Sequence, residues 1–206
     1  MLHLYTDASP NGYKVSIALE ELQLPYQLHH IRIDAGEHRQ PAFLALNPHG
    51  RIPVLVDDVA GITLFESAAI LLYLAEHSGR LLPTGPARWQ AIQWLQFHAS
   101  SMGPLLGQRV HYQLLATPSL PAVSARFIAL TEATFATLDA HLRTHTWLAG
   151  AAYSIADIAT FGWTHIATVC GFDFSPFVHL SAWHARMAAR PAVQRGIQIP
   201  EVAHGP

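Results

Sequence analysis

The sequence predicts an α/β domain over residues 1–80, followed by an all-helical domain over residues 87–206. In the first part, short runs of β-favouring residues alternate with stretches of helical hydrophobic spacing. Beyond it the chain has long helical stretches and no convincing strand. Between the two parts lies Leu81–Ala87 (LLPTGPA), whose prolines and glycine are typical of a boundary between domains.

The first elements predict two parallel strands joined by a helix. Leu2–Thr6 is a short β-compatible run, and the turn-forming cluster Asp7–Gly12 (DASPNG) follows it. Tyr13–Leu24 carries apolar residues at helical spacing, and Leu28–Ile33 mixes apolar and polar residues as a strand does. This order favours parallel pairing through a right-handed crossover.

The rest of the first domain predicts a short helix, a hairpin and a closing helix. Pro41–Leu46 is the short helical stretch, and Pro53–Val56 and Ile62–Phe65 flank a turn cluster. Glu66–His77 predicts a helix that ends at Ser78-Gly79, where glycine supplies the C-cap. The order βαβ followed by ββα fits the thioredoxin-like arrangement.

The second domain has four stretches that predict helices: Arg88–Met102, Val123–Thr144, Ile155–Cys170 and Ser181–Ala189. Gly103-Pro104 and Pro118–Pro121 are expected to interrupt the helical pattern. Ser154 and Asp157 have the spacing of a capping box, for which a structural role is favoured over a catalytic one.

The composition indicates a folded protein that binds neither nucleic acid nor membrane. Of the 206 residues, 50% are hydrophobic and 13% charged, which excludes a disordered chain. Lys and Arg number 12 against 14 Asp and Glu, so the basic excess of a nucleic-acid binder is missing. Apolar runs such as Ala68–Ala75 fall short of the ~20 residues that a membrane span needs. Because Met1 leads directly into a strand, no signal peptide and a cytoplasmic location are expected.

The cysteines and histidines of the sequence show which disulfide, metal and thiol chemistry this protein can carry out. Cys170 is the only cysteine, so neither a disulfide framework nor a CxxC motif is present. The 14 histidines show no HExxH or comparable spacing, and no metal site is expected. Because no cysteine lies in the first domain, a mechanism in which an enzyme cysteine of that domain attacks a disulfide is excluded.

Three features of the first domain predict a small-molecule site, and the first is Ser9–Gly12 (SPNG). It lies between a strand and a helix, where helix N-terminal amides point into the loop. A hydroxyl there, together with those amides, is suited to stabilising a thiolate or another anion. The alternative is that Ser9 or Asn11 only caps the helix, and this feature taken alone favours the cap.

The second and third features are Arg51–Val54 (RIPV) and the pair Glu66-Ser67. A cis Ile52–Pro53 bond would expose the main chain of Ile52 to an extended, peptide-like ligand. Glu66 and Ser67 lie between a strand and a helix, where Ser67 is suited to cap the helix and Glu66 to complement its dipole. In the functional interpretation, the carboxylate binds an ammonium and the hydroxyl with the amides binds a carboxylate. Such a bipolar socket suits the α-amino acid end of a ligand.

Taken in this order, the motifs closely resemble the cytosolic glutathione transferases. In the first domain the resemblance is carried by Ser9–Gly12 (SPNG), Asn47–Leu55 (NPHGRIPVL) and Phe65–Ile70 (FESAAI). In the second domain, Tyr153–Ala159 (YSIADIA) is similar to the family's N-capping box and Arg190–Arg195 (RPAVQR) to its C-terminal stretch. Pro10-Asn11-Gly12 and Gly103–Gln108 (GPLLGQ) most resemble the Nu class, which includes bacterial glutathione-dependent disulfide-bond reductases.

The resemblance implies where glutathione binds in the first domain. It places the γ-glutamyl end against Glu66 and Ser67. It pairs the cysteinyl backbone with the main chain of Ile52, with Pro53 in the cis form.

The resemblance also implies which residues lie near the thiol and near the glycyl end of the tripeptide. Ser9 and Asn11 occupy the thiol-facing loop and are the candidate catalytic residues. Ser9 stands where the class usually has threonine, and it keeps the hydroxyl. His38 and Arg51 fall near the glycyl end.

In the second domain, four residues are candidates for lining the pocket of the second substrate: Gln108, Arg109, His111 and Tyr112. Arg109 stands where an amide or a small polar residue is expected, which implies different binding of anionic groups at the floor of the site.

The function that the resemblance implies is that of a homodimeric enzyme with glutathione as co-substrate and no metal. Bound glutathione thiolate attacks a disulfide or a small electrophile, and Ser9 or Asn11 donates a hydrogen bond to the sulfur. Two alternatives remain open: a non-catalytic glutathione-binding regulatory module, and a dimerisation module that has lost glutathione binding.

Overall fold

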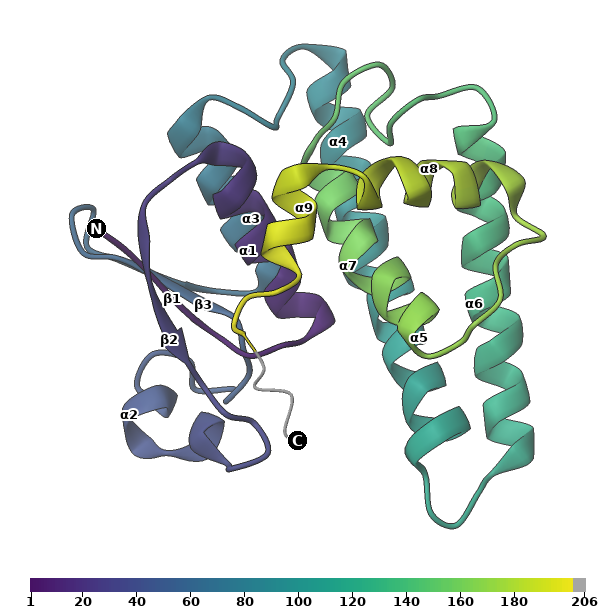
Figure 1. Cartoon of the computed structure of the whole chain (residues 1–206), viewed down its shortest axis with the longest axis horizontal. Coiled ribbons are helices and arrows are strands. Elements are labelled where there is room, and N and C mark those ends of the chain that lie inside the picture. Colours follow the sequence, from purple (N-terminus) through teal and green to yellow (C-terminus); the bar gives the residue numbers. More distant parts are fainter. Residues whose placement is uncertain (202–206) are drawn as a thin grey trace. The chain divides into compact units, whose positions relative to one another are not determined.

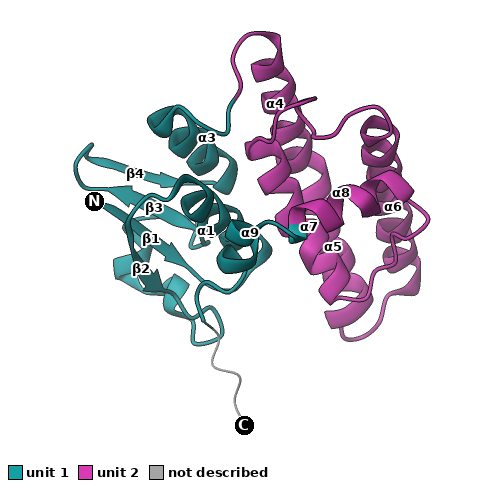
Figure 2. Ribbon diagram, turned by 45° about the horizontal axis from the view of Figure 1, so that its top comes forward, with its two compact units in different colours: residues 1–82, 188–206 teal, residues 83–187 magenta. Residues whose placement is uncertain are grey.

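The computed structural model describes residues 1–201, which form two compact units (Figure 2). The first unit consists of residues 1–82 and 188–201, and the second of residues 83–187. The division after Leu82 lies inside the expected linker, whereas the last described helix joins the first unit. The domain limits 1–80 and 87–206 stay a prediction.

The first unit is built on a four-stranded mixed sheet (Figure 1). Its strands are β1 (Leu2–Thr6), β2 (Tyr26–His30), β3 (Val54–Asp57) and β4 (Ile62–Phe65), in the spatial order β2-β1-β3-β4. β1 is parallel to β2 and antiparallel to β3, and β3 and β4 form the predicted antiparallel hairpin. The thioredoxin-like arrangement is confirmed, and each strand overlaps its expected run.

Helices α1 (Pro10–Leu22) and α3 (Ser67–Ser78) pack against each other and against the sheet, and α2 (Pro41–Leu44) precedes β3. α1 begins before the expected start because Pro10 suits the first helical position and Ser9 caps the helix. These helices and the sheet enclose fully buried apolar side chains: Leu4, Val15, Leu19, Leu71 and Leu74.

The last described helix, α9 (Pro191–Gly196), packs directly on α1 (Figure 1). Ser16 Oγ donates a 2.6 Å hydrogen bond to the main-chain oxygen of Gly196. A Cβ atom at Gly196 would lie 2.6 Å from the Cα of Ile17, so only glycine allows this approach. The contact explains why α9 joins the first unit although the sequence places it with the helical half.

The second unit begins with a helical run that the sequence predicts to break. α4 (Pro86–Phe97) continues through a π-helical segment, His98–Met102, into α5 (Gly103–Val110). The expected interruption at Gly103-Pro104 is therefore wrong. The wider π turn, in which Gly103 N–H donates to the carbonyl of His98, accommodates a proline that has no N–H of its own.

The remaining helices of the second unit follow the prediction more closely. A second π-helical segment, His111–Leu115, precedes the expected loop, and α6 spans Pro121–Leu142. α7 (Ile155–Val169) and α8 (Val178–Ala188) follow. Within residues 1–201, no helix has the length and apolar character that crossing a bilayer requires.

The start of α7 is the predicted capping box. Ser154 Oγ accepts from the amide of Ala156, and the Asp157 carboxylate accepts from the amide of Ser154 at 3.0 Å. Asp157 also accepts from Leu148 N and Trp183 Nε1, each at 2.9 Å. Burial raises the pKa of Asp157 to about 6, against the effect of these hydrogen bonds.

Candidate functional site

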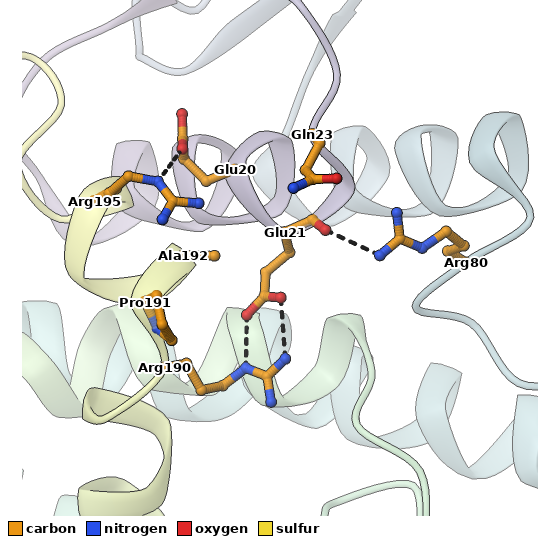
Figure 3. Close-up of a pocket in the computed structure, with 8 residues that line it drawn as sticks. All are labelled: Glu20, Glu21, Gln23, Arg80, Arg190, Pro191, Ala192 and Arg195. Carbon is orange, nitrogen blue, oxygen red and sulfur yellow. Dashed lines mark hydrogen bonds and ion pairs between the residues drawn. The ribbon is translucent and has the colours of Figure 1, made fainter.

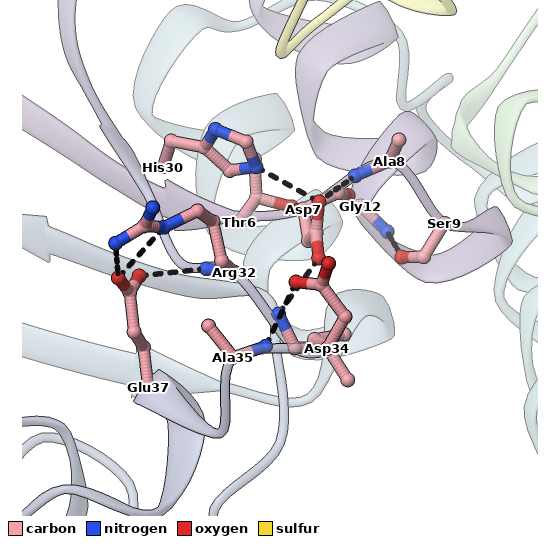
Figure 4. Close-up of polar contacts among 11 residues, drawn as sticks. Thr6, Asp7, Ala8, Ser9, Gly12, His30, Arg32, Asp34, Ala35 and Glu37 are labelled. Atoms are coloured by element: carbon pink, nitrogen blue, oxygen red, sulfur yellow. Dashed lines mark hydrogen bonds and ion pairs between the residues drawn. The ribbon is translucent and has the colours of Figure 1, made fainter. Parts of the chain in front are cut away.

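The turn after β1 brings Ser9 and Gly12 together at the start of α1 (Figure 4). Ser9 Oγ accepts a 3.0 Å hydrogen bond from the Gly12 amide, so Ser9 caps the helix, and its thiol-facing role stays a prediction. A Cβ atom at Gly12 would overlap Thr6 Oγ1 and lie 2.5 Å from the carbonyl oxygen of Asp7. The turn therefore requires glycine at this position.

Asp7, for which the sequence predicted no functional role, holds this turn in place (Figure 4). Its carboxylate accepts from the amides of Ala8 and Ile33 at 2.8 and 3.0 Å and contacts His30 Nε2 at 3.0 Å. Burial opposes ionisation of Asp7, but the hydrogen bonds from Ile33, His30 and Ala8 lower its pKa overall. Asp7 thus ties the turn next to Ser9 to the end of β2.

Lys14, in the second turn of α1, connects two of the expected site residues. Its Nζ donates to Asn11 Oδ1 at 2.8 Å and to Ser67 Oγ at 3.3 Å. The side chain is only 3% exposed. Burial lowers the pKa of Lys14 to about 7, and the charge of Glu66 opposes this shift. Lys14 was not predicted as a site residue, although two features of the sequence distinguish it: it is the only lysine of the chain, and it interrupts the apolar stripe of its helix.

Glu66 and Ser67 form the start of α3, but not in the expected capping roles. Glu66 is the N-cap residue, and its side chain makes no capping hydrogen bond. The expected cap, Ser67, is instead the first residue inside the helix. The first main-chain bond of α3 runs from Ile70 N to Glu66 O, which leaves the three preceding amides without a partner inside the helix. Glu66 has φ 71°, an unusual value for a residue with a side chain, and such strain is typical of functional sites.

The segment before β3 contains the cis Ile52–Pro53 bond that the resemblance implied. Ile52 packs with Phe43 and Val54 in a small apolar cluster. Asn47 Nδ2 donates to the carbonyl oxygen of Arg51 at 2.7 Å and thereby fixes the main chain directly before Ile52. Apolar packing and a side-chain hydrogen bond thus both hold this segment.

His38 and Arg51, the expected residues at the glycyl end, lie on neighbouring segments. His38 is in the short 3₁₀ helix Glu37–Arg39, and a Cβ atom at Gly50 would be 3.0 Å from its main-chain oxygen. Its Nδ1 is buried, with no hydrogen-bond partner in the part of the chain that the structure describes. The exposed Arg51 donates through Nε to His49 Nε2 at 2.9 Å.

The candidate residues of the second unit have very different surroundings. Arg109 is 6% exposed and donates to Thr131 Oγ1 at 2.9 Å and to Gln113 Oε1 at 3.0 Å. Its guanidinium lies 4.2 Å from the ring centre of Phe172, and burial lowers its pKa. Its charged group is therefore engaged inside the helical unit.

The other three candidates of that unit, Gln108, His111 and Tyr112, are more accessible. Gln108 and His111 are exposed, whereas Tyr112 is half-buried and stacks on Phe127 at a ring-centre distance of 5.5 Å. Their place in a substrate pocket stays a prediction.

A polar pocket of about 430 Å³ in the first unit contains none of the expected site residues (Figure 3). Its lining residues are Glu20, Glu21, Gln23, Arg80, Arg190, Pro191, Ala192 and Arg195. Arg190 pairs with Glu21 through two hydrogen bonds of 2.6 and 3.0 Å, and Arg195 pairs with Glu20 at 2.7 Å. These pairs fasten α9 to α1, and the pocket is interpreted as structural.

A thioredoxin-like sheet followed by helices, with this turn and this cis-proline segment, defines the class of protein. The family model "Glutathione S-transferase, N-terminal domain" matches residues 8–77, and "Glutathione S-transferase, C-terminal domain" matches residues 129–191. The chain is 35% identical over 203 residues to the disulfide-bond oxidoreductase YfcG of Escherichia coli (strain K12), a match that covers 96% of this chain and 94% of YfcG. The chain therefore belongs to the glutathione S-transferase family, and its similarity to YfcG agrees with the resemblance to the Nu class.

Two solved structures show how similar the fold is. A glutathione transferase from Burkholderia graminis, with two glutathione molecules bound per subunit, has a TM-score of 0.91 and 37% identity, covering 97% of this chain and 88% of that one. A glutathione transferase from Pseudomonas putida, with one glutathione disulfide bound per subunit, has a TM-score of 0.89 and 37% identity, covering 97% and 91%. Within residues 1–201, no group of three His, Cys, Asp or Glu residues is suited to hold a metal ion.

Proposed function

We propose that this protein is a glutathione-dependent enzyme that reduces disulfides or conjugates small electrophiles with the thiolate of bound glutathione. The observation that carries the proposal is the meeting of two helix starts, because Asn11 of α1 and Ser67 of α3 both bind Lys14. Groups suited to a thiolate and to a carboxylate thus lie in one small region. The named relatives, a disulfide-bond oxidoreductase and two transferases holding glutathione or its disulfide, support the same chemistry.

The start of α3 and the cis-proline segment are the proposed anchors of the ligand's peptide part. Glu66 binds the γ-glutamyl ammonium, and Ser67 with the first amides of α3 binds the γ-glutamyl carboxylate. The main chain of Ile52, next to cis Pro53, pairs with the cysteinyl backbone.

The turn before α1 and the segments around His38 supply the proposed contacts at the sulfur and at the glycyl end. Asn11 or Ser9 donates a hydrogen bond to the sulfur and lowers the pKa of the thiol. The Ser9 hydroxyl accepts from Gly12 and still carries a proton that it can donate. Arg51 and His38 meet the glycyl carboxylate.

The proposed reduction uses two molecules of glutathione and no cysteine of the protein. The thiolate of bound glutathione attacks one sulfur of the disulfide, which forms a mixed disulfide and releases the other sulfur as a thiolate that takes up a proton. A second glutathione thiolate attacks the mixed disulfide, giving glutathione disulfide and the second reduced thiol. Two electrons pass from the two glutathiones to the substrate. With an electrophile, the first thiolate instead forms a thioether, either by displacing a leaving group that departs with the bonding electron pair or by adding to an activated double bond whose other carbon takes up a proton.

The finer parts of the proposal concern partners and location. We place the protein in the cytoplasm as a homodimer. The second substrate is a small electrophile or disulfide that binds near Gln108, Arg109, His111 and Tyr112.

Calorimetric titration with glutathione and, separately, with glutathione disulfide tests the proposal. Binding of the disulfide together with turnover of a model disulfide supports reduction, and binding of glutathione alone supports conjugation. Glu66→Ala is expected to weaken glutathione binding about tenfold or more, because it removes the partner of the γ-glutamyl ammonium. Glu76→Ala, at an exposed position near the other end of α3, is the control and should bind normally. Binding without turnover over a broad panel of substrates would contradict the enzyme and favour a regulatory module.

A further inference from the structure

Lys14 is an exceptional cation in this chain. All other basic side chains among the 12 lysines and arginines are arginines, and Lys14 is the only lysine. It is buried in the first unit, and no carboxylate within residues 1–201 forms an ion pair with it. A buried charge without a paired carboxylate is costly, so a functional reason for it is to be expected.

The chemistry of the ammonium decides how its two partners are oriented. An ammonium has three N–H donors and no acceptor. It therefore contacts Asn11 through the amide oxygen, which directs the amide NH₂ group to the opposite side. In the same way it occupies an acceptor position of the Ser67 hydroxyl, whose own proton is directed elsewhere. Both partners of Lys14 are thereby set up as donors.

We propose that Lys14 is a positioning residue that orients Asn11 toward the sulfur and Ser67 toward the γ-glutamyl carboxylate of the same glutathione molecule. This inference rests on the proposed function, since it assigns a role within the same site. Lys14 contacts one residue at the start of each helix. A single buried cation thus orients the residue that faces the sulfur and the residue that binds the γ-glutamyl carboxylate. Lys14 does not touch the reacting atoms and acts through the side chains that it holds.

The electrostatics of the site supports this role. The pKa of Lys14 is lowered by burial to about 7, so near neutral pH the free protein holds Lys14 partly neutral. Glu66, at the start of α3, is the charged group whose field favours the ammonium. A thiolate and a carboxylate bound on Asn11 and Ser67 add negative charge on the same side. Ligand binding is therefore coupled to proton uptake by Lys14.

Because the chain has one lysine, this coupling can be measured directly on the intact protein. Selective labelling with [ζ-¹⁵N]lysine gives a single lysine side-chain resonance, whose pH titration reports Lys14. The probe ligand is S-methylglutathione, which has no thiol proton to release. S-methylglutathione carries no thiolate, but its γ-glutamyl carboxylate binds at Ser67 and adds negative charge beside Lys14. We therefore expect it to shift the Lys14 titration upward by about one pH unit, and calorimetry in buffers of different ionisation enthalpy to show net proton uptake. S-methylglutathione that binds without moving this titration would overturn the inference and leave the proposed function intact. No binding of either glutathione or S-methylglutathione would overturn both.

Variants test whether Lys14 acts through Asn11. Lys14→Met is expected to weaken glutathione binding about tenfold and to raise the pKa of the bound thiol, read from ultraviolet thiolate absorbance, by about one unit. In an Asn11→Ala background, Lys14→Met should cause little further change in that thiol pKa, because the group it positions is already absent. Fully additive effects would contradict positioning through Asn11.

A matched control separates positioning from folding. Ser16→Ala removes a buried hydrogen bond of the same helix to Gly196 and touches neither Asn11 nor Ser67. It should lower thermal stability without changing the pKa of the bound thiol. An equal change in this pKa in both variants would assign the effect of Lys14 to the stability of α1 and overturn the inference.

Discussion

Lys14 in the first unit and Asp157 in the second are both buried ionisable side chains near the start of a helix, but their surroundings differ. Asp157 accepts hydrogen bonds from Leu148, Ser154 and Trp183, all of which belong to its own unit. Among the described residues, Lys14 donates only to the neutral side chains of Asn11 and Ser67.

The difference indicates what each group is for. The hydrogen bonds that Asp157 accepts come from its own unit and include the capping box of α7, so this group stabilises the fold even though burial raises its pKa. Within residues 1–201 Lys14 has only neutral hydrogen-bond partners, so its positive charge remains available to an anionic ligand. Lys14 contacts both the start of α1 and the start of α3, where we propose that glutathione binds.

The largest effect is expected at Asp157. Asp157→Ala should lower the free energy of unfolding by about 3–5 kcal/mol, because it leaves several buried donors without an acceptor. Chemical denaturation followed by circular dichroism measures this loss. Asp139→Ala is the comparison: Asp139 accepts from the amides of His179 and Leu180 at the start of α8, and losing this half-buried cap should cost about 1 kcal/mol. Equal losses would remove the distinction that we draw for Asp157.

At Lys14 the expected change in stability has the opposite sign. Lys14→Met replaces a buried ammonium by an apolar side chain, and we expect the free energy of unfolding to stay the same or to rise by up to about 3 kcal/mol. The same denaturation experiment measures it. A marked loss of stability would show that Lys14 holds the fold together as Asp157 does.

The pH dependence of stability should separate the two groups as well. The pKa of Lys14 is about 7 in the folded protein and near the ordinary lysine value of 10.5 in the unfolded chain, so between these values the unfolded chain binds the additional proton. Stability therefore rises with pH in this window, by at most about 1.4 kcal/mol per pH unit, and Lys14→Met should lack this rise. For Asp157 the folded pKa of about 6 lies above the ordinary aspartate value of 3.8. Its contribution to stability is therefore complete below pH 3.8 and is lost as the pH rises through 6. Unfolding curves of wild type and Lys14→Met at several pH values test the first slope, and parallel curves would contradict it.

The smallest effect is expected at Ser9. Ser9→Ala removes the hydroxyl that caps α1 and should cost about 1 kcal/mol of stability. Ser9→Thr keeps both the cap and the hydroxyl and should behave as wild type. Comparing turnover of the two variants then tests the thiol-facing role of Ser9: if Ser9→Ala keeps full activity, Asn11 alone serves the sulfur.

Features that depend on neighbouring residues were predictable from the sequence. The four strands follow from local β-favouring runs and turn clusters, and the capping box follows from the spacing of Ser154 and Asp157. The cis Ile52–Pro53 bond followed from the resemblance, since spacing and composition carry no signal for it. The continuous helix through Gly103-Pro104 was missed because a proline usually ends a helix, and a π turn absorbs its missing donor here.

By itself, the amino-acid sequence determined the order of the elements, the thioredoxin-like first domain and the motifs of the family, because each depends on residues close together in the chain. Only the tertiary structure decided that α9 packs on α1 through Gly196 and that Asp7 braces the turn beside Ser9. It also decided the position of Lys14, whose contact with Ser67 joins residues 53 positions apart. In the sequence Lys14 is one polar residue in an apolar stripe. In the fold α3 packs against α1 and Lys14 is buried, and its side chain lies between the residues that we propose to bind glutathione.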